Sequence, residues 1–287
     1  MTKWIERMMT VIDGNQLKII RVPIPTPTLL PHFTTNGYLI GNENESILVD
    51  AGYDQPETRT ELDEALKRNG IAIPHAIILT HSHPDHAPGV RQLMDWNPVI
   101  YCHQNEKQAT LSAISPVDKV SFLNDGDVMH VGGEEIQVIH APGHTAGQLN
   151  LYIPSMEILV AGDNIVAEGT SWIGPPDGNM SDYLSTLYRL KELKMKKIGP
   201  GHGGWIEKPY EHIEFVIQRR LLRENQIVSL LKQHQKLTSV DLTNMIYQEL
   251  PHPSVYEVAR RTTEAHLIKL IKEGSVTKQD SIFLLKE

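Results

Sequence analysis

The chain has 287 residues, 40% of them hydrophobic, which is enough for one large globular domain or for a large and a small one. A formal net charge of −8 gives no global attraction to nucleic acid or to an anionic membrane. The first residues lack the apolar run of a signal peptide, and no stretch of about 18 apolar residues occurs, so neither export nor a membrane span is expected. The single cysteine, Cys102, excludes an intrachain disulfide and favours a reducing compartment, so we expect a cytoplasmic protein.

Strand-like and helix-like segments alternate over the larger, N-terminal part of the chain. Apolar runs predict strands at residues 17–22, 37–42, 46–52, 75–81, 98–103, 134–141, 148–153 and 157–163. Helices are predicted between them, at Pro56–Asn69, at about Gly89–Trp96 and at Met180–Leu193. This alternation predicts an α/β domain in which helices flank the sheet.

The pattern changes at about Glu211. Apolar residues at helical spacing form one stripe: Ile217, Leu221, Val228 and Leu231. A second helical segment follows over residues 237–250 and opens with the Thr-x-x-Asp spacing of a capping box. Residues 254–274 predict a third helix that ends at a glycine, and residues 275–287 predict a short hairpin with a turn at 278–280. We therefore predict a catalytic domain over residues 1–209 and a winged-helix domain over residues 210–287.

The stretch LTHSHPDHAPG, residues 79–89, concentrates metal-compatible side chains directly after a buried strand. Four of them lie within six positions: His81, His83, Asp85 and His86. Loops at the carboxyl ends of strands commonly hold ligands in α/β folds. Prolines within and just after the cluster oppose a continuous helix, so these side chains are expected to point inward from a folded-back loop.

Three more candidate ligands lie at other strand ends, each beside glycine. They are His144 in APGHTAG, Asp163 in LVAGDN and His202 in IGPGHGG. Glycine permits the tight backbone path that lets such side chains reach a shared centre. Imidazole and carboxylate suit zinc, manganese and iron. Seven ligands suffice for two metals roughly 3.5–4 Å apart if one carboxylate bridges them, and such a pair can hold a hydroxide between the ions.

These motifs together resemble the metallo-β-lactamase superfamily. HSHPDH matches its His-x-His-x-Asp-His motif, and LVDAG, PGHTAG, AGDN and GPGHG match its other motifs. The resemblance covers about residues 15–205 and implies an αββα sandwich of two mixed sheets with the site along one edge. It implies one metal on His81, His83 and His144, and a second on Asp85, His86 and His202. Asp163 would bridge the two metals, and Asp50 would orient the histidine loop.

Within the superfamily, Asp163 and the THxHxDH pattern look like the glyoxalase II type of hydrolase. The tail looks instead like the winged helix of the β-lactamase-like protein 2 group, of which a mitochondrial member is an endoribonuclease acting on single-stranded RNA. The resemblance implies a hydrolase that carries two divalent metals, with zinc favoured over manganese or iron. A metal-bridging hydroxide would attack a small ester, a thioester or a related substrate, and Asp85 would orient it or accept its proton. Cleavage of single-stranded RNA is the alternative.

The charge of the tail leaves this alternative open. From Glu211 to the end, 11 lysines and arginines face 10 acids, whereas the rest of the chain carries 16 against 25. Phosphate binding normally shows as a basic patch, and here acids interleave with Arg219, Arg220 and Arg223. A packing module or a homodimer contact fits the tail equally well.

Two segments are further candidates for contact with a substrate. Residues 168–179 closely follow Asp163, so Trp172 and Ile173 could form an apolar wall of the pocket, although a buried connection fits them equally well. His32 or Phe33 could reach the mouth of the pocket. Cys102 is expected to be a small core residue and not a nucleophile.

Overall fold

The computed structural model describes residues 8–14, 16–27, 32–248 and 255–286. Contacts between residues divide the chain into two compact units. The first runs to Ala141 and also contains Gly147–Gly169 and Leu193–Pro209. The second contains Pro142–Ala146, Thr170–Glu192 and the chain from Tyr210 onward. The expected domain boundary at residue 209 stays a prediction.

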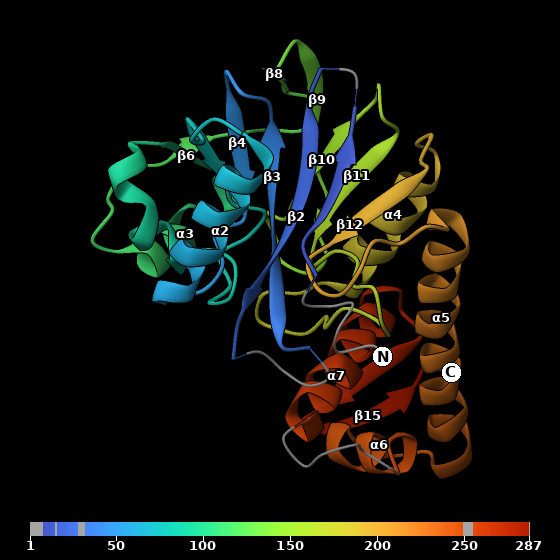
Figure 1. Cartoon of the computed structure of the whole chain (residues 1–287). Coiled ribbons are helices and arrows are strands. Elements are labelled where there is room, and N and C mark those ends of the chain that lie inside the picture. The colour runs from blue at the N-terminus through green and yellow to red at the C-terminus, as the bar shows by residue number, and fades with distance from the viewer. Residues whose placement is uncertain (1–7, 15, 28–31, 249–254, 287) are drawn as a thin grey trace. The chain divides into compact units, whose positions relative to one another are not determined.

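The first unit contains a seven-stranded sheet whose strands follow one another in chain order (Figure 1). They are β1 (Thr10–Asp13), β2 (Lys18–Pro25), β3 (Thr34–Gly41), β4 (Ser46–Val49), β5 (Ala76–Ile78), β6 (Val99–Cys102) and β7 (Ser121–Phe122). Pairing is antiparallel from β1 to β4 and parallel from β4 to β7. Because β4, β5 and β6 are parallel, their carboxyl ends lie at the same end of the sheet, and the loops that follow them start there.

A second, five-stranded sheet completes the strands of this unit. Its order is β12 (Lys197–Pro200), β11 (Ile158–Gly162), β10 (Leu149–Ile153), β9 (Glu134–His140) and β8 (Val128–Val131). Only the β11–β12 pair is parallel among these neighbours. Asp163 follows β11 and His202 lies two residues after β12, so both candidate ligands leave this sheet at one edge.

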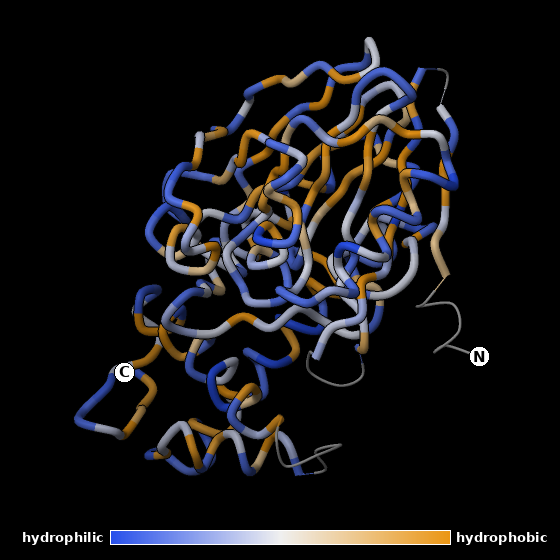
Figure 2. Tube along the Cα trace, turned by 60° about the vertical axis from the view of Figure 1, so that its left-hand side comes forward, coloured by the Kyte–Doolittle hydropathy of each residue, from blue (hydrophilic) through white to orange (hydrophobic). Residues whose placement is uncertain are grey.

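The first sheet buries both faces, which explains why its strands are nearly continuous apolar runs. Ile20 packs in a cluster with Leu62 and Leu66, which lie on helix α2 (Pro56–Asn69). The neighbouring Ile19 points to the other face and packs in a cluster with Leu151 of β10. Figure 2 shows apolar residues running along these strands. The first unit is therefore layered as helices, first sheet and second sheet.

The remaining helical segments of this unit are η1 (Pro88–Trp96), η2 (Gln104–Glu106) and α3 (Lys107–Ile114). Helix α2 has the predicted bounds and ends at Gly70, which has a left-handed φ of 62°. The helix predicted near residues 89–96 is present as a 3₁₀ helix that starts at Pro88. Helix α3 and strands β1, β7 and β8 were not predicted, because their sequences lack a clear apolar period.

The second unit contains α4 (Met180–Lys191), α5 (Pro209–His234), α6 (Ser239–Ile246) and α7 (Tyr256–Lys272), with a sheet in the order β13 (Leu237–Thr238), β15 (Ile282–Leu285), β14 (Val276–Gln279). Its core is apolar: Ile227, Leu231, Leu237, Leu242, Leu267, Leu270, Val276 and Phe283. Thr238 and Asp241 form the predicted capping box. The hairpin turns at Asp280, as predicted, so α5 to β15 form the expected winged helix. Residues 249–250 and 254 of the predicted helices lie outside the described residues.

Among the residues that the structure describes, no helix has the length and apolarity that spanning a membrane requires.

Candidate metal centre

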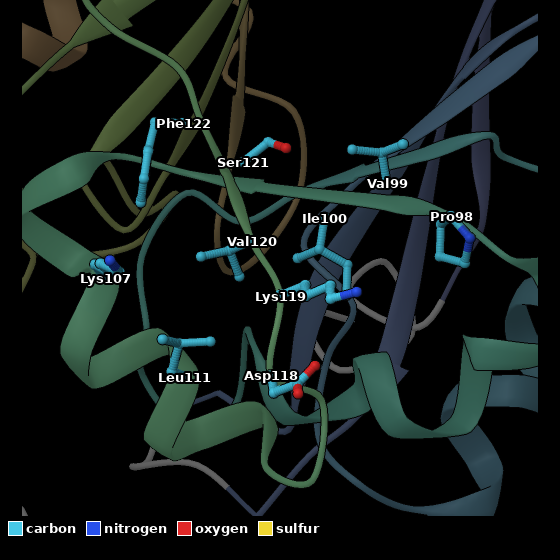
Figure 3. A pocket seen from close by; sticks show the side chains of 10 residues that line it. All are labelled: Pro98, Val99, Ile100, Lys107, Leu111, Asp118, Lys119, Val120, Ser121 and Phe122. Carbon is cyan, nitrogen blue, oxygen red and sulfur yellow. The ribbon is translucent and has the colours of Figure 1, made fainter.

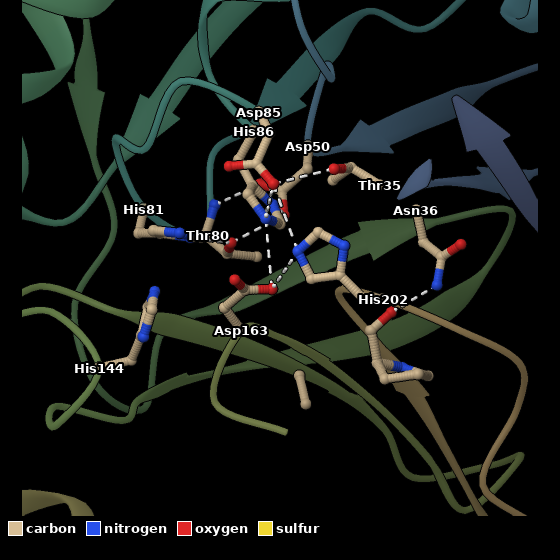
Figure 4. A network of polar contacts seen from close by, with 12 residues as sticks. Thr35, Asn36, Asp50, Thr80, His81, Asp85, His86, His144, Asp163 and His202 are labelled. Atoms are coloured by element: carbon tan, nitrogen blue, oxygen red, sulfur yellow. Dashed lines mark hydrogen bonds and ion pairs between the residues drawn. The ribbon is translucent and has the colours of Figure 1, made fainter. Parts of the chain in front are cut away.

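Candidate ligands from both sheets of the first unit meet at the strand ends. Figure 4 shows Asp85, His86, Asp163 and His202 pointing toward one another. His86 Nε2 lies 3.3 Å from Asp163 Oδ1 and 3.7 Å from Asp85 Oδ2. His202 Nε2 lies 3.3 Å from each of the same two oxygens. Two imidazoles and two carboxylates thus share one small centre, in which both histidines are almost fully buried.

The histidine loop is built around Asp50, the first residue after β4, whose φ of 59° lies in the left-handed region. Asp50 Oδ1 accepts a hydrogen bond from the Thr80 amide at 2.8 Å, and Oδ2 accepts one from Thr80 Oγ1 at 2.8 Å. His86 Nδ1 lies 2.7 Å from the same Oδ2. A carboxylate can only accept, so a neutral His86 donates from Nδ1 and keeps the lone pair of Nε2 for the centre.

Thr80 extends this orientation to His81. Its hydroxyl donates to Asp50, so its lone pair is available to the Nδ1 of His81, 3.0 Å away. His81 is fully buried, and its ring centre lies 4.3 Å from that of His86 and 4.5 Å from that of His83. One ligand atom from each of Asp50, His81 and His86 lies within 4.8 Å of the others. The expected role of Asp50 in orienting the loop is consistent with these contacts.

The loop of His202 is held from the first sheet. His202 Nδ1 lies 2.9 Å from the carbonyl oxygen of Thr34, so a neutral ring donates there and presents Nε2 to the centre. Asn36 donates from its side chain to the carbonyls of Pro200 and Gly203, at 2.8 and 2.9 Å. The fully buried Arg21 donates to Asn36 Oδ1 at 2.9 Å. Sequence reasoning missed Arg21 and Asn36, which carry no local motif.

Glycines permit the close approach of the two loops from the second sheet. A Cβ at Gly201 would lie 2.0 Å from Asp163 Oδ1. A Cβ at Gly162, which has a φ of 48°, would lie 2.6 Å from Thr80 Oγ1. Any larger residue at either position would displace a candidate ligand or the threonine that orients His81. This explains the glycines beside Asp163 and His202 in the sequence.

The electrostatics favour a cation. Burial opposes ionisation of Asp163, yet His202 and His86 hold its pKa well below its usual range. Burial also opposes ionisation of Asp85, but the same two histidines lower its pKa. Burial opposes the charge of His202, and Asp163 with Asp85 raises its pKa to about 10. Both carboxylates are therefore charged at neutral pH, and His202 is protonated as long as no metal is bound, so a metal would displace that proton when it binds Nε2. The oxygen and nitrogen donors, one set of which (Asp85, His86, His202) lies within 4.8 Å, fit a divalent metal.

Two smaller contacts complete this centre. Thr35 Oγ1 donates to Asp85 Oδ2 at 3.0 Å and so orients that carboxylate. The ring of His32 stacks on the ring of His202 with 5.1 Å between their centres, which places His32 beside the centre, as considered from the sequence. Thr35 was not predicted, because a threonine at the start of a strand carries no signal of its own.

The other candidates belong to the second unit or to the core. His144 lies in the segment Pro142–Ala146, and its Nδ1 is 2.7 Å from the carbonyl oxygen of Trp172. Ile173 is fully buried and Trp172 partly so. Their expected roles stay predictions. Cys102 is fully buried in the core of the first unit.

Family comparisons agree with this geometry. A family model described as the metallo-beta-lactamase superfamily matches residues 30–202, and one described as a beta-lactamase associated winged helix domain matches residues 238–283. A beta-lactamase-like protein 2 homolog of Caenorhabditis elegans is 33% identical over 84% of this chain and 80% of its own length. The homolog of Drosophila melanogaster is 30% identical over 90% of this chain and 89% of its own length. An atrochrysone carboxyl ACP thioesterase of Cryptosporiopsis is 27% identical over 75% of this chain and 63% of its own length.

Solved structures share the fold. A beta-lactamase domain protein from Burkholderia ambifaria has a TM-score of 0.83 at 17% identity, over 96% of this chain and 93% of that one. The protein TTHA1623, crystallised in a di-iron-bound form, has a TM-score of 0.52 at 28% identity, over 66% of this chain and 96% of its own. The matched residues 30–202 include the strand-end motifs, and the matched residues 238–283 lie in the winged helix. The chain therefore belongs to the metallo-β-lactamase superfamily, as a metal-dependent hydrolase with a β-lactamase-associated winged-helix domain.

Proposed function

We propose that this protein hydrolyses a small ester or thioester with two divalent metals bound at the strand ends. The observation that carries the proposal is the convergence of Asp85, His86, Asp163 and His202, with 3.3 Å between Asp163 Oδ1 and each of the two imidazole Nε2 atoms. An oxygen equidistant from His86 and His202 suits a carboxylate that would bind the same metal as these two histidines. Burying two carboxylates together costs desolvation free energy unless a positive charge compensates them.

The proposed ligands follow the sequence motifs. His81, His83 and His144 would hold one metal, Asp85, His86 and His202 would hold the other, and Asp163 would serve both. Asp50, Thr80 and the Thr34 carbonyl support this assignment, because they leave Nε2 of His81, His86 and His202 as the atom with the lone pair.

Bound metals would supply a nucleophilic water at neutral pH and would stabilise the negative charge that develops on the substrate oxygen. Asp85 is the proposed catalytic residue of the chain itself. The Thr35 hydroxyl donates a hydrogen bond to Oδ2 of Asp85 and so orients the plane of that carboxylate. A carboxylate fixed in this way can orient the attacking water and accept its proton. Trp172 stays in the proposal as the substrate wall; Ile173, whose side chain is fully buried, would support that wall from behind.

The substrate class is argued from two observations. A relative that is 27% identical is named a thioesterase, and thioester hydrolysis needs only an activated water and a stabilised oxyanion. Against RNA, basic residues of the winged helix are engaged within their own unit. Arg220 is 6% exposed and donates to the carbonyl of Ser171, and Arg260 forms ion pairs with Glu257 and Glu264. Arginines that are already paired within the protein do not neutralise the phosphates of RNA, so they do not gain the free energy that release of the RNA's counterions provides to a free basic patch.

Zinc is the metal that we propose first, because three of the imidazoles are oriented to present Nε2. Iron is the alternative, because the similar protein TTHA1623 was solved in a di-iron-bound form. We also retain a cytoplasmic location, a homodimer and a domain boundary at residue 209 as parts of the proposal. Metal analysis, cell fractionation, light scattering of the full chain and limited proteolysis test them in that order.

The decisive experiment compares the full chain with Asp163→Ala and His83→Ala. Bound metal is measured by mass spectrometry, and turnover is measured with nitrophenyl ester, thioester, lactone, phosphodiester and single-stranded RNA probes. His130→Ala and Asp127→Ala serve as controls, since His130 is exposed and the Asp127 carboxylate accepts its hydrogen bond from Asn124 in an exposed turn. We expect both ligand variants to lose metal and thioester turnover, and both controls to keep them. Unchanged metal content and turnover would refute the assignment, and salt-sensitive cleavage of RNA alone would favour the nuclease.

A further inference from the structure

A buried carboxylate outside the recognised motifs lies beside the histidine loop. Glu106 is the last residue of η2, just before α3, and is 4% exposed. Its Oε2 accepts a hydrogen bond from Ser82 Oγ at 2.6 Å, and its Oε1 accepts one from the amide of Gly147 at 3.1 Å. Ser82 stands between His81 and His83, and Gly147 follows His144 by three residues.

From these contacts we propose that Glu106 is a positioning residue of the metal centre. Its side chain ties the loop that carries His81 and His83 to the chain that leads from the His144 turn into β10. The inference deepens the proposed function and rests on it, since it assumes that these histidines bind metal. One residue at the end of η2 thus joins the histidine loop to the segment that enters β10.

The packing around Gly147 supports a spacing role. A Cβ at Gly147 would lie 2.6 Å from Glu106 Cγ, 2.9 Å from the Glu106 nitrogen and 3.2 Å from His103 Nδ1. The backbone therefore runs against the side chain of Glu106 at a distance that only glycine allows. This accounts for the glycine that closes the motif PGHTAG without any role in holding a ligand.

A carboxylate suits this position because its two oxygens can accept from two different loops at once. Hydrogen bonds to a charged group are shorter and stronger than neutral ones, and the Ser82 bond is short. Glutamine could keep the same geometry, since its oxygen accepts from Gly147 and its amide can donate to the Ser82 hydroxyl. Alanine removes both contacts, and Ser82→Ala removes only one.

The adjacent residue provides a matched control. Lys107 is exposed and lines a separate cavity of about 540 Å³ bordered by β6, α3 and β7 (Figure 3). None of the candidate metal ligands lines that cavity. Glu45 provides a second control, because its carboxylate accepts from the amide of Gly132 at 2.6 Å and makes the same kind of side-chain bond to a loop glycine in another part of the unit.

The test measures the zinc affinity of the full chain by chelator competition, the absorption spectrum of bound cobalt(II), and the urea stability of the metal-free protein. Glu106→Ala is expected to lose roughly 10- to 100-fold in zinc affinity, the usual effect of removing a partner that orients ligands. Its cobalt spectrum should change as well. Glu106→Gln should restore most of the affinity, Ser82→Ala should lose less than Glu106→Ala, and Lys107→Ala and Glu45→Ala should bind zinc as the wild type does.

Three outcomes overturn the inference. A Glu106→Ala protein that binds zinc and gives a cobalt spectrum like the wild type removes the positioning role while leaving the proposed function intact. A Glu45→Ala protein that loses as much affinity as Glu106→Ala at equal stability shows that destabilisation alone is responsible. A wild-type chain that binds no metal refutes the proposed function and this inference together. If Glu106→Ala does not fold, the zinc affinities of Ser82→Ala and Glu106→Gln are compared instead. A Ser82→Ala protein that binds zinc as tightly as the wild type then overturns the inference.

Discussion

Asp50→Asn should disturb two candidate metal ligands, His81 and His86, at once without changing the volume of the side chain. In the wild type, Oδ2 of Asp50 accepts from both Thr80 Oγ1 and His86 Nδ1. An asparagine that keeps the bond from the Thr80 amide through its oxygen turns its NH₂ toward those two atoms. The NH₂ then donates to His86 Nδ1, which moves the ring proton to Nε2. It also donates to Thr80 Oγ1, which frees the hydroxyl to donate to His81 Nδ1.

Both rings would then carry a proton on the nitrogen that faces the centre. Removing one outer partner of a ligand typically lowers metal affinity by about 10- to 100-fold. Since two candidate ligands are affected, we expect the upper end of that range, about 2.8 kcal/mol at about 1.4 kcal/mol for each factor of ten. Hydrogen bonds to a charged group contribute roughly 1.5–3 kcal/mol each, so the loss of two from Asp50 is large enough to account for this effect.

The assay is competition for zinc between the full chain and a chromophoric chelator, with Asp127→Asn as the control. The Asp127 carboxylate accepts a hydrogen bond from the Asn124 amide in an exposed turn, so this change should leave zinc affinity unaltered. Urea unfolding of the metal-free variants separates loss of stability from loss of affinity. An Asp50→Asn protein that binds zinc as tightly as the wild type would refute the tautomer argument.

Four further predictions each concern one residue. Asn36→Ala removes three buried hydrogen bonds and should lower the free energy of unfolding by about 3 kcal/mol in urea titrations, whereas Asn42→Ala removes three bonds that are at most partly buried and should cost less. Gly201→Ala places a Cβ 2.0 Å from Asp163 Oδ1 and should reduce bound metal measured by mass spectrometry; normal metal content would contradict this. Burial raises the pKa of Cys102 to about 11, so the native thiol should resist alkylation at pH 8 and react only in urea. Since this folded-state pKa lies above 9.0, the thiol's contribution to stability is complete below about pH 9 and should be lost as pH rises toward 11, which urea titrations at several pH values can follow. Finally, Arg219→Ala should not change RNA binding in filter assays if the winged helix has no phosphate-binding role, whereas a clear loss would favour the nuclease alternative.

The sequence identifies the loops of the candidate ligands, because their signal is local. Each motif follows an apolar strand and carries its histidine or aspartate beside glycine or proline, so a window of a few residues contains the whole pattern. Periodicity predicts the α/β class and the helices and hairpin of the winged helix, whereas the sandwich of two sheets comes from the family resemblance. Asp50 was found only through that resemblance, since a lone aspartate after a strand has no distinctive spacing.

The residues that support the loops could not be predicted, because their partners are far away along the chain. Arg21 sits in a strand and resembles any charged strand residue, yet it is fully buried and donates to Asn36 and to the Gly203 carbonyl. Asn36 reaches Pro200 across 164 positions, and Glu106 reaches Ser82 across 24. Such contacts depend on the order of strands in the two sheets, which no local window contains.

Ligands and supports therefore make different contributions, and this separates their variants. A candidate ligand such as His83 lies on a loop whose backbone is fixed by other residues, so its loss would remove one proposed metal bond and leave the fold in place. A support such as Asn36 or Glu106 joins two segments through buried hydrogen bonds, so its loss moves a whole loop and also lowers the stability of the metal-free chain. Variants of candidate ligands should therefore lose zinc affinity while the metal-free stability stays unchanged. Variants of supporting residues should lose zinc affinity and metal-free stability together. Convergence of the two groups would mean that the loops are held by the metal itself and not by the side chains beneath them.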